Sequence, residues 1–124
     1  MTIEQAKQFA ADWIDSWNNH DLSKILGHYS EDVEFSSPLI QLLKFNETGT
    51  ITSKAVLAKY FQIGLDAFPD LKFKLHNVFG GVDTVVIYYE SVNGRMAAEV
   101  FRLDESLKAV SVFCNYTNEK STYQ

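Results

Sequence analysis

The chain has 124 residues, the size of one domain, and its 46% hydrophobic residues supply ample material for a core. Its net charge of −5 and its scattered Lys and Arg residues argue against a nucleic acid or an acidic membrane as partner. The single cysteine, Cys114, excludes an internal disulfide. With three separated histidines no standard metal-site spacing occurs, so we expect no metal and no cofactor.

The N-terminal segment contains no basic stretch followed by an apolar one, so a signal peptide is not predicted. No apolar run approaches the ~20 residues that a membrane-spanning helix needs. We therefore expect a soluble, cytoplasmic protein.

The first half of the chain predicts three helices. Apolar residues recur at steps of three and four over residues 3–19, which is typical of an amphipathic helix. Asp21 is suited to cap a short second helix, which a strand at Val33 to Ser36 follows. Residues 37–52 read as an irregular loop over the rim of the fold. A third helix begins near Ser53 and ends before Pro69.

The second half predicts consecutive antiparallel strands. Residues 71–76 alternate in polarity, and residues 82–92, 95–103 and 108–117 are separated by the turn signals Asn93-Gly94 and Glu105-Ser106. Helices followed by hairpins favour an α+β fold, with three N-terminal helices packed on one face of a curved antiparallel sheet. We expect one domain over residues 1–124, with a pocket between the helices and the sheet.

The turn signals also predict which side chains share a sheet face. If Asn93-Gly94 is a two-residue loop, Val92 pairs with Arg95, and the strand partners follow by alternation. The candidate ligand-binding face then carries Tyr88, Glu90, Glu99, Phe101, Val112, Cys114 and Tyr116. The other face is apolar too, which predicts a homodimer formed through it.

Glu99 is the main catalytic candidate because it lies in mid-strand among apolar residues. A carboxyl group without water or a partner there keeps its proton, and beside Tyr88 it forms a pair of donors for a developing oxyanion. The alternatives are an ion pair with Arg95 or Arg102, or a solvated place at the sheet edge.

Further candidates come from the helices and the first strand. His28 has the ordinary pKa of a general base, near ~6.5, if it approaches the pocket mouth; a surface position is the alternative. An aromatic set is suited to a small, flat, apolar ligand, or simply to core packing. Its members are Trp13, Trp17, Tyr29, Phe35 and Tyr60.

Two stretches resemble the nuclear-transport-factor-2-like superfamily, and within it the SnoaL-like and ketosteroid-isomerase-like branch. They are NNHDLSKILGHYSEDVEF and FPDL. The resemblance covers nearly the whole chain and implies a cone-shaped, cystatin-like fold with a deep apolar cavity, usually dimeric through the sheet.

The resemblance to ketosteroid isomerases is incomplete at their functional positions. Their carboxylate base corresponds to Ser37, which cannot accept a proton at neutral pH, and their helix tyrosine corresponds to Trp13. Their second oxyanion donor corresponds to Glu99. One of the three functional positions therefore keeps an acid and the base is missing, so we do not expect steroid isomerase activity by that mechanism.

Three functions remain open from the sequence. The first is binding of a small apolar or aromatic molecule. The second is an enzyme of the isomerase, lyase or hydratase kind that uses Glu99 and Tyr88, with His28 as base. The third is an association module that dimerises through the sheet and keeps a vestigial cavity. Fold alone does not choose among them.

Overall fold

A computed structural model describes residues 1–117 of the chain. Within them the chain forms four α-helices, α1 (Ile3–Asn18), α2 (Leu22–Leu26), α3 (Pro38–Leu42) and α4 (Lys54–Ala67). The six strands of the same region are β1 (Tyr29–Ser36), β2 (Thr50–Ile51), β3 (Lys74–Gly80), β4 (Thr84–Glu90), β5 (Met96–Leu103) and β6 (Ala109–Tyr116). A short 3-10 turn, η1 (Val92–Gly94), joins β4 to β5.

Polar caps define where the helices begin. Thr2 and Gln5 form a complete capping box at α1, and the side chains of Asp21 and Ser53 accept backbone N–H groups at the starts of α2 and α4. The helix predicted to begin near Ser53 is therefore present, but it is the fourth helix of the chain and not the third. Ser37 and Pro38 instead start the additional helix α3 inside the segment that the sequence pattern left irregular.

The strands form one mixed sheet in the order β2-β1-β6-β5-β4-β3. Most neighbours are antiparallel, but β1 and β6 run parallel, with Phe35 beside Val112. The expected all-antiparallel sheet is wrong at this pair. A pairing between two strands that lie far apart in the chain leaves no turn signal in the sequence.

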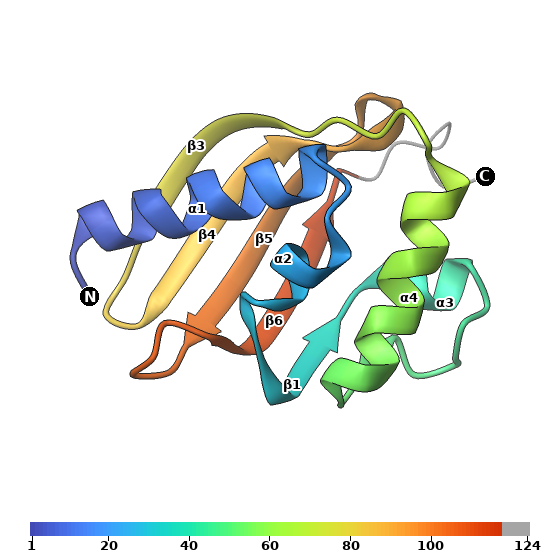
Figure 1. Cartoon of the computed structure of the whole chain (residues 1–124), viewed down its shortest axis with the longest axis horizontal. Helices are drawn as coiled ribbons and strands as arrows, with labels where there is room; N and C mark the ends of the chain where they lie inside the picture. The colour runs from blue at the N-terminus through green and yellow to red at the C-terminus, as the bar shows by residue number, and fades with distance from the viewer. Residues whose placement is uncertain (118–124) are drawn as a thin grey trace.

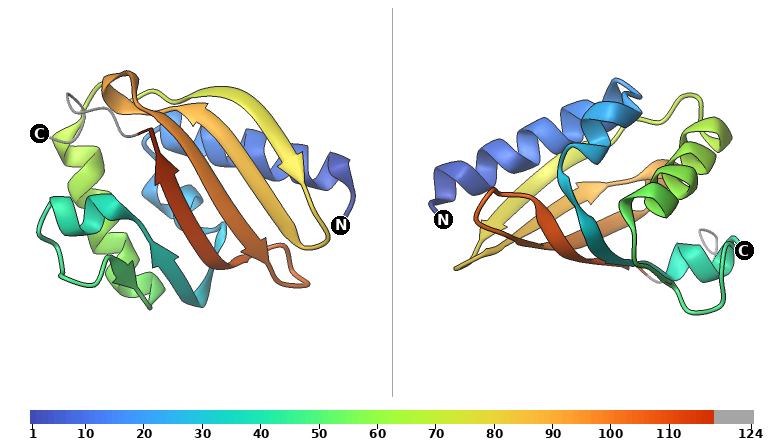
Figure 2. Two further views of the ribbon diagram at one scale, coloured as in Figure 1. Left: turned by 180° about the vertical axis from the view of Figure 1, so that it is seen from behind. Right: turned by 60° about the horizontal axis from the view of Figure 1, so that its bottom comes forward.

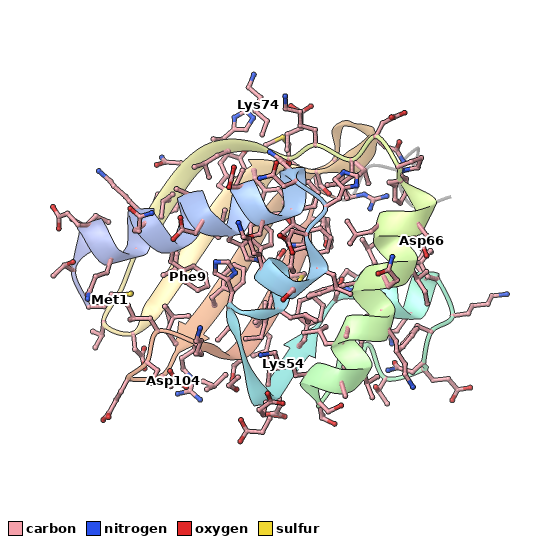
Figure 3. All side chains as sticks on the ribbon, viewed as in Figure 1. Met1, Phe9, Lys54, Asp66, Lys74 and Asp104 are labelled. Carbon is pink, nitrogen blue, oxygen red and sulfur yellow. The ribbon has the colours of Figure 1, made fainter. Side chains whose placement is uncertain are left out.

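The helices cover one face of the sheet, and the core lies between the two layers (Figure 1). Helix α1 crosses β3 and β4, and α4 packs beside β1. Phe9 lies between α1 and the sheet, whereas labelled charged residues such as Lys74 and Asp104 extend outward (Figure 3). The α+β architecture expected from the sequence is confirmed.

No helix formed by residues 1–117 covers the opposite face of the sheet. In Figure 2 (left), strands β3 to β6 lie in front and α1 lies behind them. Phe113 and Tyr88 on this outer face are 54% and 39% exposed. The described residues contain no helix with the length and apolarity required to cross a bilayer.

Candidate functional site

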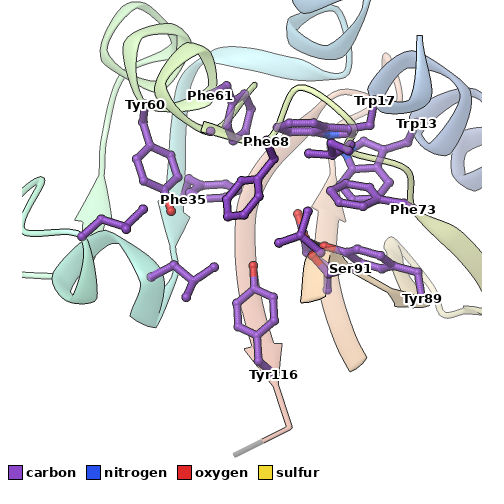
Figure 4. Close-up of a pocket in the computed structure, with 16 residues that line it drawn as sticks. Trp13, Trp17, Phe35, Tyr60, Phe61, Phe68, Phe73, Tyr89, Ser91 and Tyr116 are labelled. Atoms are coloured by element: carbon purple, nitrogen blue, oxygen red, sulfur yellow. Dashed lines mark hydrogen bonds between the residues drawn. The ribbon is translucent and has the colours of Figure 1, made fainter. Parts of the chain in front are cut away.

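A cavity opens between the helix layer and the sheet (Figure 4). Its volume is about 100 Å³, and a single ordered water needs roughly 10–15 Å³. It therefore has room for several waters or for one ring-sized molecule. The lining residues are Trp13, Trp17, Phe35, Leu39, Leu43, Tyr60, Phe61, Gly64, Phe68, Leu71, Phe73, Tyr89, Ser91, Val92, Glu99 and Tyr116.

The walls of the cavity are mainly aromatic. Trp13 stacks on Phe73 with ring centroids 5.7 Å apart, and Trp17 meets Phe61 edge-on at 4.9 Å. These rings come from α1, α4 and the segment before β3. Aromatic faces of this kind suit a flat apolar ligand, since they offer large contact area with little loss of side-chain entropy.

Glu99 is the acidic side chain of the cavity wall. It lies in the middle of β5 and is 3% exposed. The Tyr89 hydroxyl donates a hydrogen bond of 2.7 Å to its Oε1 atom. The solvated position at the sheet edge, one alternative reading of this residue, is therefore wrong.

Burial controls the protonation of Glu99. Removal from water raises its pKa to about 7, against the smaller opposing effects of hydrogen bonds from Tyr89 and Cys114. The carboxyl group thus carries a proton in a large part of the molecules at neutral pH. A protonated carboxyl can donate a hydrogen bond as well as accept one.

The neighbouring hydroxyl groups remain protonated too. Burial raises the pKa of Tyr60, Tyr89 and Tyr116 above the ordinary range. In Figure 4 the Tyr60 and Tyr116 rings approach from different sides, and their hydroxyls point towards the middle of the cavity. The polar end of the cavity is therefore rich in neutral hydrogen-bond donors.

The two tryptophans of α1 differ in how their indole nitrogens are satisfied. Trp13 Nε1 donates to the Tyr29 hydroxyl at 2.9 Å. Trp17 Nε1 is buried and has no hydrogen-bond partner among residues 1–117. An unsatisfied buried donor is uncommon in a folded protein.

The structure corrects the predicted positions of Tyr88 and Glu90. Ser91 to Arg95 form a five-residue connection, so Glu90 pairs with Met96 and Tyr89 with Ala97. This register differs by one residue from a two-residue hairpin, and such a slip exchanges the two faces of a strand. Tyr88 and Glu90 consequently lie on the outer face, and Tyr89 takes the place expected for Tyr88 beside Glu99.

His28 lies in a different cleft from the predicted one. The cleft is formed by α1, α2 and the β5–β6 loop, and His28 Nδ1 is 3.0 Å from the Lys24 carbonyl oxygen. Its ring meets Phe9 edge-on at 5.2 Å. Burial lowers the pKa of this imidazole. The expected position at the pocket mouth is wrong, because helical periodicity does not show which end of a helix faces the pocket.

The other predicted binding residues fall into two groups. Trp13, Trp17, Phe35, Tyr60, Glu99 and Tyr116 line the cavity, and their contact with a ligand stays a prediction. The second group is buried but does not line it, and comprises Tyr29, Ser37, Phe101, Val112 and Cys114. The other lining residues were not predicted; among them are Tyr89, which the correct strand register would have placed here, and Gly64.

Ser37 has a structural role that its sequence position did not indicate. Its hydroxyl caps α3 by accepting the Leu39 N–H at 3.2 Å. Hydrogen bonding to Ser37 also opposes the burial that raises the pKa of Tyr60 and Tyr116. In the described part of the chain, no three His, Cys, Asp or Glu side chains gather as potential metal ligands.

The fold and the cavity define a helix-covered, cone-shaped protein of the nuclear-transport-factor-2-like class. The SnoaL-like domain matches residues 10–113. A SnoaL-like protein of unknown function from Burkholderia thailandensis is 37% identical, and its crystal structure superposes with a TM-score of 0.90 over 94% of this chain and 98% of its own. The chain therefore belongs to the SnoaL-like family, and the resemblance found in the sequence is confirmed.

More distant structures share the fold alone. A nuclear-transport-factor-2-like protein of unknown function from Cytophaga hutchinsonii is 14% identical, with a TM-score of 0.70 over 96% of this chain and 95% of its own. The epoxide hydrolase/cyclase-like enzyme SalBIII, which has a role in pyran ring formation in the polyether salinomycin, is 16% identical. Its TM-score is 0.74 over 93% of this chain and 92% of its own. A search of curated proteins gives no match.

Proposed function

We propose that the chain binds a small, mostly apolar molecule whose oxygen atom accepts a hydrogen bond at the Glu99 end of the cavity. One observation carries the proposal: a carboxyl group that is 3% exposed and has a pKa of about 7 stands in the wall of an aromatic cavity. Cavities that bind small molecules combine apolar walls with a few polar groups in this way.

The protonation states select the kind of ligand. Protonated Glu99 and the hydroxyls of Tyr60 and Tyr116 are donors that suit a carbonyl oxygen or a similar neutral acceptor. An anionic ligand suits the site less once Glu99 is ionised, because like charges repel in a medium of low polarity.

The affinity for a neutral carbonyl compound should therefore fall as the pH rises through about 7. For acetophenone as a one-ring probe, we expect a constant affinity at low pH and a loss approaching about tenfold per pH unit above the pKa of Glu99. Isothermal calorimetry between pH 5.5 and 8.5 measures this profile.

The Glu99→Gln variant is the control for that titration. Glutamine keeps an N–H donor but does not titrate, so its affinity for acetophenone should be nearly independent of pH. A wild-type affinity that is the same at pH 5.5 and pH 8.5 would contradict the assigned role of Glu99.

An enzyme of the isomerase, lyase or hydratase kind is the second candidate, and the protonation of Glu99 favours it. A carboxyl group with a pKa of about 7 is well matched to proton transfer at neutral pH. Tyr89, not Tyr88, would position it. Among the described lining residues Glu99 is the only one with a carboxyl group, and none is a histidine. A basic group of the substrate itself would therefore have to accept the proton in such a reaction. Glu99→Gln should then abolish turnover but leave ligand binding intact.

A homodimer through the outer sheet face is a separate proposal. Tyr88 and Phe113 are exposed there, and Val100 pairs with Phe113 in the neighbouring strand. An apolar face left open on a monomer would be unusual.

Native mass spectrometry at micromolar concentration tests this proposal. It should show a dimer for the wild type and a monomer for Phe113→Glu, while the exposed control Lys72→Glu stays dimeric. A monomeric wild type would refute the dimer.

A further inference from the structure

We propose that Gly64, in the last turn of α4, sets the size of the ligand that the cavity admits. The inference rests on the proposed binding function and adds a residue that determines its specificity. Gly64 belongs to the cavity wall, together with Tyr60 and Phe68. These three positions are four residues apart, so they share one face of the helix.

Glycine is an unfavourable residue at this position. In a helix interior it destabilises the fold relative to alanine, because its unfolded backbone has more freedom to lose. The neighbouring inward positions of α4 carry the large buried side chains Leu57, Phe61 and Leu65. A residue without a side chain therefore needs a reason here.

The backbone supplies no such reason. Gly49 and Gly94 have positive φ angles, which favour glycine. A Cβ atom at Gly27, Gly80 or Gly81 would approach a neighbouring atom within 3.4 Å. At Gly64 neither condition holds, since an added Cβ would meet no atom within 4 Å. Gly94 also has open space there but needs glycine for its positive φ angle, so Gly64 is the one glycine of the six that neither its backbone nor a close neighbour explains.

Gly64 is half-buried and lines the cavity, so the open space beside it adjoins the cavity. Leu43 and Phe68, two other lining residues, are 56% and 36% exposed, so the lining continues from the buried Glu99 to the surface. The cavity volume of about 100 Å³ is enough for one ring. A ligand larger than one ring would then extend towards this exposed part of the lining, beside Gly64.

Two probes with the same carbonyl group separate ring size from polar recognition. Acetophenone has one ring and 2-acetylnaphthalene has two. Gly64→Leu should weaken binding of 2-acetylnaphthalene by about tenfold or more, because its side chain fills the outer space. The same substitution should change the affinity for acetophenone less than about threefold. Calorimetry or ligand-detected NMR at pH 6 measures both.

Two further variants control for bulk and for stability. Ala55→Leu adds a leucine to an exposed position of the same helix and should leave both affinities unchanged. Gly64→Ala should raise the midpoint of thermal unfolding by about 3–5 °C, since helix propensity improves and the Cβ has room. A lower midpoint for Gly64→Ala would contradict the open space on which the inference depends.

The binding results distinguish size selection at Gly64 from the proposed binding function. If Gly64→Leu binds both probes as the wild type does, or loses both equally, size selection at Gly64 is wrong and the binding function stands. If the wild type binds neither probe, both proposals are wrong. A selective loss of the two-ring probe supports both.

Discussion

Replacing Glu99 with glutamine should make the folded chain more stable than the wild type at pH 8, and most of this difference should disappear at pH 5. Burial raises the pKa of Glu99 from 4.5 to about 7. The stability contributed by the protonated form is thus fully present below pH 4.5 and is lost as the pH rises through about 7. At roughly 1.4 kcal/mol for each pKa unit, the gain at pH 8 is about 3 kcal/mol.

Chemical denaturation of the two proteins at several values between pH 5 and pH 8 measures this effect. Glu105→Gln is the matched control, because Glu105 is exposed in the loop between β5 and β6. We expect its stability to follow the wild type at every pH. If Glu99→Gln and the wild type show parallel curves, Glu99 does not titrate near neutrality.

Removing the hydroxyl of Tyr89 should have the opposite effect at high pH. The hydroxyl donates at 2.7 Å to Glu99 and opposes the effect of burial on its pKa. Hydrogen bonds to charged groups contribute about 1.5–3 kcal/mol. Tyr89→Phe should therefore destabilise the chain by about 2–3 kcal/mol at pH 8, destabilise it less at pH 5, and raise the pKa of Glu99 further.

Tyr88→Phe is the natural comparison for that variant. The two tyrosines are adjacent in β4, but Tyr88 is 39% exposed on the outer face. Loss of its hydroxyl should change the free energy of unfolding by less than about 0.5 kcal/mol. Equal effects of the two substitutions would show that the register of β4 against β5 is not the one described.

The helices could be predicted because their signals are local. The apolar periodicity and the capping box of α1 and the Ser53 cap of α4 give nearly the observed bounds. The parallel pairing of β1 with β6 could not be predicted, since it depends on contacts between distant segments. Helices α2 and α3 are both five residues long and show no periodic pattern; the Asp21 cap predicted α2, whereas the Ser37-Pro38 start of α3 lies in a stretch that otherwise resembles a loop.

At this site, a register error of one residue changes which side chains face the cavity, whereas an error of two residues does not. The β5–β6 pairing is displaced by two residues from the expected one, so Val112 and Cys114 keep the predicted face. The β4–β5 pairing is displaced by one, because Arg95 closes the connection by bonding to Val92 and Ser91. Glu99 could be found without any register, since a carboxylate in an apolar mid-strand is conspicuous by itself.

Carbon-13 NMR titration of the Glu99 side-chain carboxyl, with and without saturating acetophenone, tests the binding hypothesis most directly. We predict a midpoint near 7 in the free protein and a higher one with the probe, because a ligand that prefers the protonated acid must raise its pKa by linkage. A midpoint near the ordinary value of 4.5, or one that acetophenone leaves unchanged, would contradict a ligand site built on this carboxyl group.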